Sequence, residues 1–140
     1  MEREISDPFP ERQREVEQAM EGLLAAIHAK DADRLESFHL YGPKFTKFDD
    51  FEPLERVDAE RCRAGEREGI SKVDDIEYRV EDLKVDVFGR VAVATFLLHE
   101  NMGLEGERIS ALARSTLVWV FDGERWRITH EHFSPFKGNP

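Results

Sequence analysis

The apolar positions in the first third of the chain recur at helical spacing. Within residues 9–30 they are separated by steps of four, three, one and three residues, which places them on one face of an amphipathic helix. These positions are Val16, Met20, Leu23, Leu24 and Ile27. A second, shorter helix follows Asp31, whose carboxylate caps it, and ends before Gly42. Residues 44–50 predict a short strand, and residues 57–68 predict a charged surface helix.

The second half of the chain alternates between apolar and polar residues with the period of two that strands require. Apolar side chains occupy even positions over residues 76–80 and odd positions over residues 83–87. Such a change of parity inside one strand predicts a β-bulge, because one extra residue re-aims every side chain after it. Residues 91–101 are apolar on both parities and predict a strand that is buried on both faces.

Residues 109–121 and 126–133 are rich in β-branched and aromatic side chains. The Asp-Gly pair at residues 122 and 123 separates them, so they predict a β-hairpin. Helices followed by a meander of long antiparallel strands indicate an α+β fold, with the N-terminal helices packed on one face of the sheet. A curved, bulged sheet closed by helices encloses a cone-shaped cavity.

The length and charge of the chain limit its domain organisation and the kinds of partner that it binds. The 140 residues predict one domain over residues 9–136, with a loose leader at 1–8 and a tail at 137–140. The net charge of −10 and the lack of a basic cluster argue against a nucleic-acid or membrane partner. Cys62 is the single cysteine, so no internal disulfide forms. Neither a signal peptide nor a long apolar run is present, and we expect a cytoplasmic protein.

The order of these elements resembles the nuclear transport factor 2-like (NTF2-like) superfamily. The ending Asp-Gly-x-x-Trp-x-Ile-x-His-x-His-x-Ser, residues 122–134, is similar to its SnoaL-like and ketosteroid isomerase-like branch and to the association domain of calmodulin-dependent kinase II. The resemblance covers roughly residues 9–136 and implies the α+β cone. It does not fix a reaction, because one fold serves many functions.

Regular alternation along the last strand would separate its polar residues. It places His130 and His132 on one face, and Glu131 on the other with Thr129 and Phe133. In the proteins that the chain resembles, the face matching Glu131 lines the cavity and the opposite face packs on a second subunit. The resemblance therefore implies a homodimer through an outer strip that consists of Trp119, Phe121, Trp126, His130 and His132.

The same alternation puts Arg114 and Thr116 on the cavity face with Glu131. A guanidinium in an apolar cavity needs an anionic partner, which is Glu131, another carboxylate or an acidic ligand. The alternative is an internal ion pair that only shapes the cavity. We expect Thr116 and Thr129 to orient a polar group of the ligand. The other residues expected to line the cavity are Tyr41, Phe48 and Phe133.

Asp49 is the second catalytic candidate beside Glu131. The resemblance places it where ketosteroid isomerases carry the carboxylate that acts as general base, although Asp50 competes for that match. Gly22 stands where those isomerases have the tyrosine that stabilises the oxyanion, so half of that apparatus is missing. The alternative is that Asp49 is a surface turn residue.

The histidine pair allows three interpretations. His130 and His132 are satisfied interface or core residues, or they bind a ligand, or they bind a metal with His99 as third ligand. Structural zinc sites need four converging ligands and catalytic sites at least three, so we expect no metal. We also expect no cofactor.

Two functions follow from these patterns. The first is a small-molecule-binding domain that acts as a cofactor-independent isomerase, cyclase or dehydratase, in which Asp49 or Glu131 moves a proton on a hydrophobic substrate. The second is a non-catalytic homodimer that binds an acidic small molecule through Arg114 or serves as an assembly platform.

Overall fold

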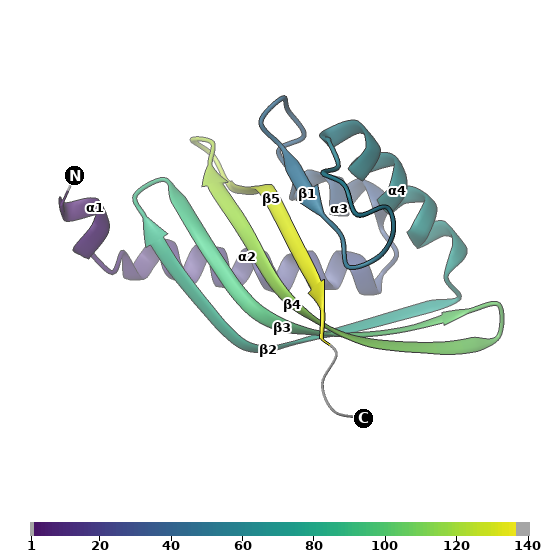
Figure 1. The fold of residues 1–140 in the computed structure, drawn as a ribbon. Coiled ribbons are helices and arrows are strands. Elements are labelled where there is room, and N and C mark those ends of the chain that lie inside the picture. The colour runs from purple at the N-terminus through teal and green to yellow at the C-terminus, as the bar shows by residue number, and fades with distance from the viewer. Residues whose placement is uncertain (1, 137–140) are drawn as a thin grey trace.

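The computed structural model describes residues 2–136, so the predicted tail at 137–140 lies outside the described residues. Helices cover one side of a five-stranded sheet (Figure 1). The helices are α1 (Glu2–Ser6), α2 (Pro10–His28), α3 (Ala32–Ser37) and α4 (Ala59–Lys72). The strands are β1 (Thr46–Phe48), β2 (Asp75–Phe88), β3 (Val91–Leu104), β4 (Glu107–Phe121) and β5 (Trp126–Pro135). The leader predicted over residues 1–8 is helical within α1, which contacts β2.

The sheet order is β1-β5-β4-β3-β2. The long strands β2 to β5 pair antiparallel, and the short β1 pairs parallel with β5. Together with the N-terminal helices, this arrangement confirms the predicted α+β cone. The parallel pair places Lys47 of β1 directly beside Glu131 in the middle of β5.

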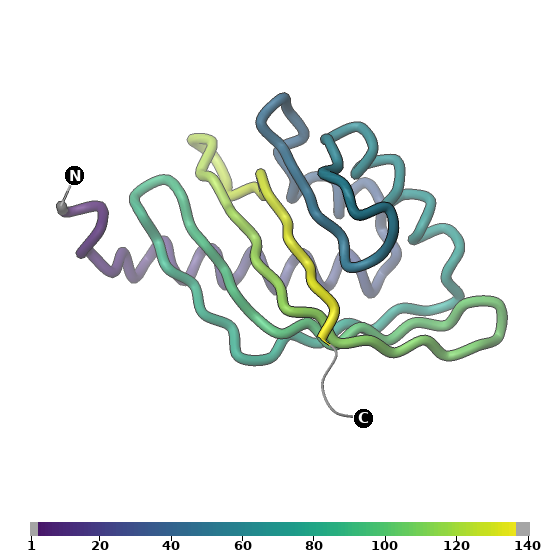
Figure 2. The backbone as a smooth tube through the Cα atoms, viewed as in Figure 1, coloured from purple at the N-terminus to yellow at the C-terminus, as the bar shows by residue number. Residues whose placement is uncertain are grey.

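The bulge predicted in β2 is confirmed. The pairing of β2 with β3 shifts between Glu81 and Lys84. Asp82 takes a positive φ of 56°, a left-handed conformation that Asp tolerates better than most side chains. The strand bends along its course, as the tube in Figure 2 shows. The bend curves the sheet around α2.

A second bulge, in β5, was not predicted. Trp119 pairs with Ile128 but Val118 pairs with His130, so Thr129 is an extra residue on β5. Every side chain after Thr129 therefore changes face relative to regular alternation. Glu131 joins Ile128 on the inner face, which is covered by the helices.

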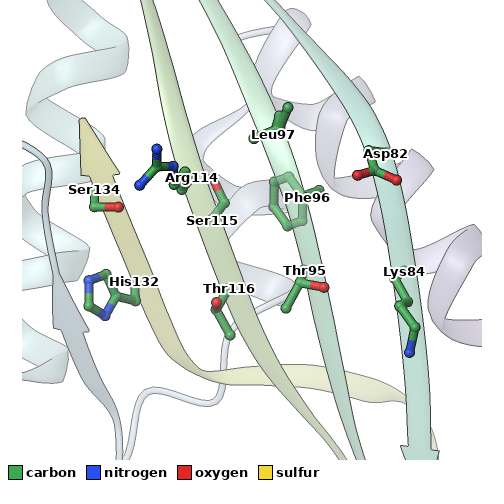
Figure 3. A pocket seen from close by; sticks show the side chains of 10 residues that line it. All are labelled: Asp82, Lys84, Thr95, Phe96, Leu97, Arg114, Ser115, Thr116, His132 and Ser134. Carbon is green, nitrogen blue, oxygen red and sulfur yellow. The ribbon is translucent and has the colours of Figure 1, made fainter. Parts of the chain in front are cut away.

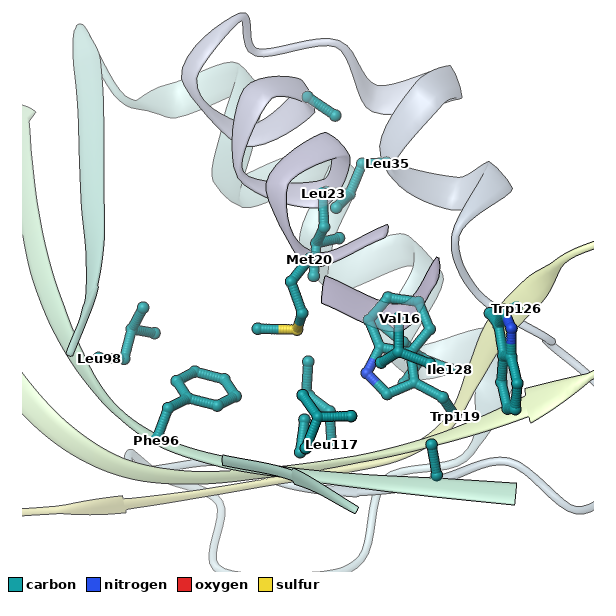
Figure 4. Packing of buried hydrophobic residues seen from close by; sticks show 14 of the residues in the cluster. Val16, Met20, Leu23, Leu35, Phe96, Leu98, Leu117, Trp119, Trp126 and Ile128 are labelled. Atoms are coloured by element: carbon teal, nitrogen blue, oxygen red, sulfur yellow. The ribbon is translucent and has the colours of Figure 1, made fainter. Parts of the chain in front are cut away.

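This bulge corrects the predicted outer strip. Trp119 is fully buried and Trp126 is 5% exposed, and both pack in the core against α2 (Figure 4). Phe121 is half-buried against the same core. The prediction that these three side chains lie on an outer face is therefore wrong. Of the predicted strip, His130 and His132 remain on the outer face.

Arg114 and Thr116 are also corrected. Thr116 pairs with His132, and Leu117 pairs with Glu131. Directly paired residues point to the same side of a sheet, so Arg114 and Thr116 share the outer face with the histidine. The prediction that they line the cavity with Glu131 is wrong, because it assumed a regular β5.

Candidate functional site

Lys47 is the centre of a cluster of charged side chains on the inner face. It lies directly beside Glu131 because β1 pairs parallel with β5. Its Nζ is 3.2 Å from Glu131 Oε2, 3.2 Å from Asp49 Oδ1 and 3.5 Å from Glu66 Oε1. Burial alone would lower the pKa of Lys47, but the surrounding carboxylates outweigh it and hold the pKa well above its usual value. Lys47 is therefore an ammonium.

His39 is the second cation of the cluster. It follows α3 and forms a parallel bridge with Ile128 of β5. Its Nδ1–H donates to the carbonyl oxygen of Leu35 at 2.8 Å, and its Nε2–H donates to Glu131 Oε1. A histidine that donates from both nitrogens is an imidazolium. Burial opposes this charge, but Glu131 outweighs burial and raises the pKa of His39 to about 9.

Glu131 is held as an anion between these two cations. It is 4% exposed, and burial alone would raise the pKa of its carboxyl. The charges and hydrogen bonds of Lys47 and His39 outweigh burial and lower that pKa. Each carboxylate oxygen has its own cationic partner.

Helix α4 contributes Glu66 to the cluster. Asp58 caps this helix by accepting from the backbone N–H of Arg61 at 3.0 Å. Glu66 accepts from the hydroxyl of Tyr41 at 3.2 Å and from the thiol of Cys62 at 3.2 Å. Burial, above all, raises the pKa of the Cys62 thiol, so this cysteine is not a nucleophile.

Glu100 forms a carboxyl pair with Asp50, and the charge of Lys47 acts on it. Glu100 is half-buried on the inner face of β3, opposite Tyr78 of β2. Burial and the charge and hydrogen bond of Asp50 raise the pKa of Glu100 to about 7, while Lys47 acts in the opposite direction. Glu100 is therefore close to half-protonated near neutral pH.

The structure brings some of the predicted residues together. Asp49 and Glu131 both contact Lys47, and the Lys47 ammonium lies 5.5 Å from the ring centre of Phe133. Tyr41 stacks on His39 with ring centroids 4.9 Å apart. Asp49, Glu131 and Phe133 therefore share Lys47 as a neighbour, and Tyr41 joins the same site through His39.

Other predicted residues lie elsewhere. Phe48 faces outward, with its ring centroid 5.6 Å from that of His132, so the prediction that it lines the cavity is wrong. Parallel pairing sets this orientation, because Lys47 and Phe48 are neighbours on one strand and point to opposite faces. Thr129 occupies the bulge of β5.

Sequence reasoning missed four residues of the site: His39, Lys47, Glu66 and Glu100. A usable signal existed only for Lys47, a charged residue between Phe45 and Phe48 in a predicted strand. The other three come from separate elements that only tertiary pairing brings together.

Three residues of the cluster form a possible metal-ligand set. Ligand atoms of His39, Glu66 and Glu131 lie within 4.8 Å of one another. The Lys47 ammonium contacts both carboxylates, so it already supplies the positive charge that a metal would bring. The predicted third ligand of the outer histidine pair, His99, instead lies 2.6 Å from a carboxylate oxygen of Glu81. Among residues 2–136, no helix is both long and apolar enough to span a membrane.

Comparison with known proteins identifies related folds. The model of the SnoaL-like domain matches residues 16–137. A candidate dehydratase of the NTF2-like family from Streptomyces avermitilis has a TM-score of 0.83 at 17% identity, covering 92% of this chain and 99% of that one. An NTF2-like superfamily protein from Salmonella enterica has a TM-score of 0.78 at 18% identity, covering 91% and 93%. No protein with a curated description matches the chain.

A third solved structure comes from Xanthomonas campestris. It is a candidate calcium/calmodulin-dependent protein kinase II association domain, with a TM-score of 0.76 at 16% identity, covering 90% of this chain and 89% of that one. At these identities the likeness shows the fold alone.

Proposed function

Because the chain belongs to the family of SnoaL-like domains, we propose that it binds a small molecule on the inner face of the cone and catalyses a cofactor-independent proton transfer there. The reaction class is an isomerisation, cyclisation or dehydration. The solved structure from Streptomyces avermitilis, a candidate dehydratase of the same fold, supports this class.

The observation that carries the proposal is a pair of glutamates with opposed protonation. Lys47 and His39 keep Glu131 ionised, whereas burial and Asp50 raise the pKa of Glu100 to about 7. The charge of Lys47 acts on both glutamates. Environments that push the pKa values of neighbouring acids apart are typical of acid–base catalysis.

Each group then has a chemical role. Glu100, with Asp50, takes a proton from the substrate and returns it, since a pKa near the working pH suits both steps. Lys47 stabilises the oxyanion that develops, and Glu131 positions Lys47. Tyr78 stays a neutral phenol, because burial raises its pKa, and it donates to a substrate oxygen.

The charge balance of the site indicates the kind of substrate. Five carboxyls face two cations: Asp49, Asp50, Glu66, Glu100 and Glu131 against His39 and Lys47. This excess of carboxyls disfavours the acidic ligand predicted for the cavity. We expect a neutral substrate whose apolar part packs against the buried side chains of β3, such as Phe96 and Leu98.

Proton exchange tests this function. We expect the protein to accelerate deuterium incorporation at the α-carbon of cyclohexanone and of 4-hydroxy-2-butanone in D₂O, followed by ¹H NMR. Glu100→Gln should reduce the rate by about 10²–10⁴-fold. The exposed Glu77→Gln on β2 is the matched control and should retain it. Exchange no faster than in buffer, or equal rates for Glu100→Gln and the parent, would contradict the proposal.

A second proposal is a homodimer through the outer face of the sheet. Near the β2–β3 and β4–β5 turns, this face carries two cross-strand pairs of valine side chains that the monomer leaves partly exposed. These are Val91, Val93, Val118 and Val120, paired in register between β3 and β4. The solved association domain from Xanthomonas campestris has the same fold and supports this proposal. Sedimentation equilibrium tests it.

The cytoplasmic location stays a prediction.

A further inference from the structure

The outer face of the sheet has a hollow in its other half, away from the four valines. The hollow has a volume of about 420 Å³ and lies across β2 to β5 (Figure 3). Its polar lining residues are Asp82, Lys84, Thr95, Arg114, Ser115, Thr116, His132 and Ser134.

Strand register explains why these polar side chains meet. Lys84 pairs with Thr95, Thr95 with Thr116, and Thr116 with His132, so one row crosses four strands. Arg114 pairs with Ser134 in the next row. The short hydroxyl side chains in the middle form the floor, and the longer Arg114 and His132 stand beside it (Figure 3).

Arg114 is the basic residue of the hollow that has no ion pair within the described chain. Over residues 2–136 its guanidinium has no carboxylate partner, and it lies 5.0 Å from the ring centroid of Phe136. The hydroxyls of Thr116 and Ser134 have no hydrogen-bond partner among the described side chains. Lys84 already pairs with Asp86. The hollow therefore holds one uncommitted cation and several uncommitted donors.

We propose that this hollow binds a small anion, a phosphate or carboxylate group, through Arg114. The planar guanidinium offers two parallel N–H donors that match either group. Thr116 and Ser134 donate their hydroxyls from the adjacent strand positions, and His132 donates a ring N–H. This site is separate from the proposed reaction on the inner face, because the sheet lies between them. The acidic ligand predicted for Arg114 thus belongs to the outer face.

Titration with two probes at constant ionic strength tests the proposal. Inorganic phosphate and acetate are each added to ¹⁵N-labelled protein against sodium chloride, and ¹H–¹⁵N shifts are followed. We expect saturable shifts clustered at Arg114, Thr116 and His132. Saturation by phosphate alone assigns a phosphate site, and saturation by acetate alone or by both assigns a general carboxylate or anion site.

Variants distinguish specific binding of the anion by Arg114 from general electrostatic attraction. Arg114→Met should weaken binding at least tenfold, which corresponds to about 1.4 kcal/mol. Arg114→Lys should retain part of the affinity, because it keeps the charge but loses the two-pronged geometry. Arg79→Met, an exposed residue of β2 outside the hollow, is the matched control and should bind as the parent does. Shifts that do not saturate, or that are equal in Arg114→Met and the parent, would overturn the proposal.

Discussion

Replacing Lys47 by methionine is expected to destabilise the fold by about 3–5 kcal/mol, the usual cost of breaking a buried ion pair by removing one partner. Glu131 would keep His39 but lose the cation on its second oxygen, while Glu66 and Asp49 would lose their shared partner. Three carboxylates would then repel one another in a site nearly closed to solvent. Urea unfolding at pH 7 measures the loss.

Two further variants identify the cause. Lys84→Met removes an exposed lysine that pairs with Asp86 and should change the free energy of unfolding by at most about 1 kcal/mol. The double variant Lys47→Met/Glu131→Met should recover a large part of the loss, because the stranded charge goes with its partner. A Lys47→Met variant as stable as Lys84→Met would mean that Lys47 is hydrated and that the cluster is not buried.

Trp119→Ala is expected to cost about 3–5 kcal/mol in free energy of unfolding, since it empties a fully buried position against α2. It should leave the sedimentation behaviour of the folded protein unchanged. Val118→Lys is the matched change one residue earlier, on the outer face. It should alter the free energy of unfolding little but weaken self-association.

The opposite result for these two variants would support the outer aromatic strip that the sequence predicts. If Trp119→Ala dissociated a dimer while leaving the free energy of unfolding within about 0.5 kcal/mol, the tryptophan would lie at an interface. The inner and outer faces of β4 would then be exchanged, and the register of β5 with them.

The two bulges show what sequence periodicity can reveal. The β2 bulge was predictable because apolar residues on both sides of it mark the change of parity, from Ile76 and Tyr78 to Val85 and Val87. The β5 bulge was not, because Trp126, Ile128 and His130 continue one unbroken alternation. Histidine is found on either face of a sheet, so nothing in the sequence marked the extra Thr129.

The candidate site was predictable only in part. Asp49, Glu131, Phe133 and Tyr41 share it as expected, though the role of each remains a proposal. Lys47 was missed because its importance depends on the parallel pairing of β1 with β5, which local sequence does not encode. Glu66 and Glu100 come from a helix and a strand that the fold closes around Lys47.

Glu100 also links the site to the pH dependence of stability. Its pKa is raised in the folded protein to about 7, so its protonated form contributes stability that is fully present below its ordinary pKa of 4.5. This contribution is lost as the pH rises through 7. Because the carboxyl is partly exposed, we expect about 1–2 kcal/mol, and Glu100→Gln should remove that part of the decline.

The proposed site centres on two glutamates with opposed protonation near one buried lysine. Carboxyl ¹³C NMR of protein labelled in its glutamate side chains, titrated from pH 4 to 9, measures this directly, with Glu100→Gln and Glu131→Gln assigning the signals. We expect Glu100 to titrate with a midpoint near 7 and Glu131 to remain ionised throughout. A Glu100 midpoint near 4.5, as for a solvated glutamate, would contradict the proposed acid–base site.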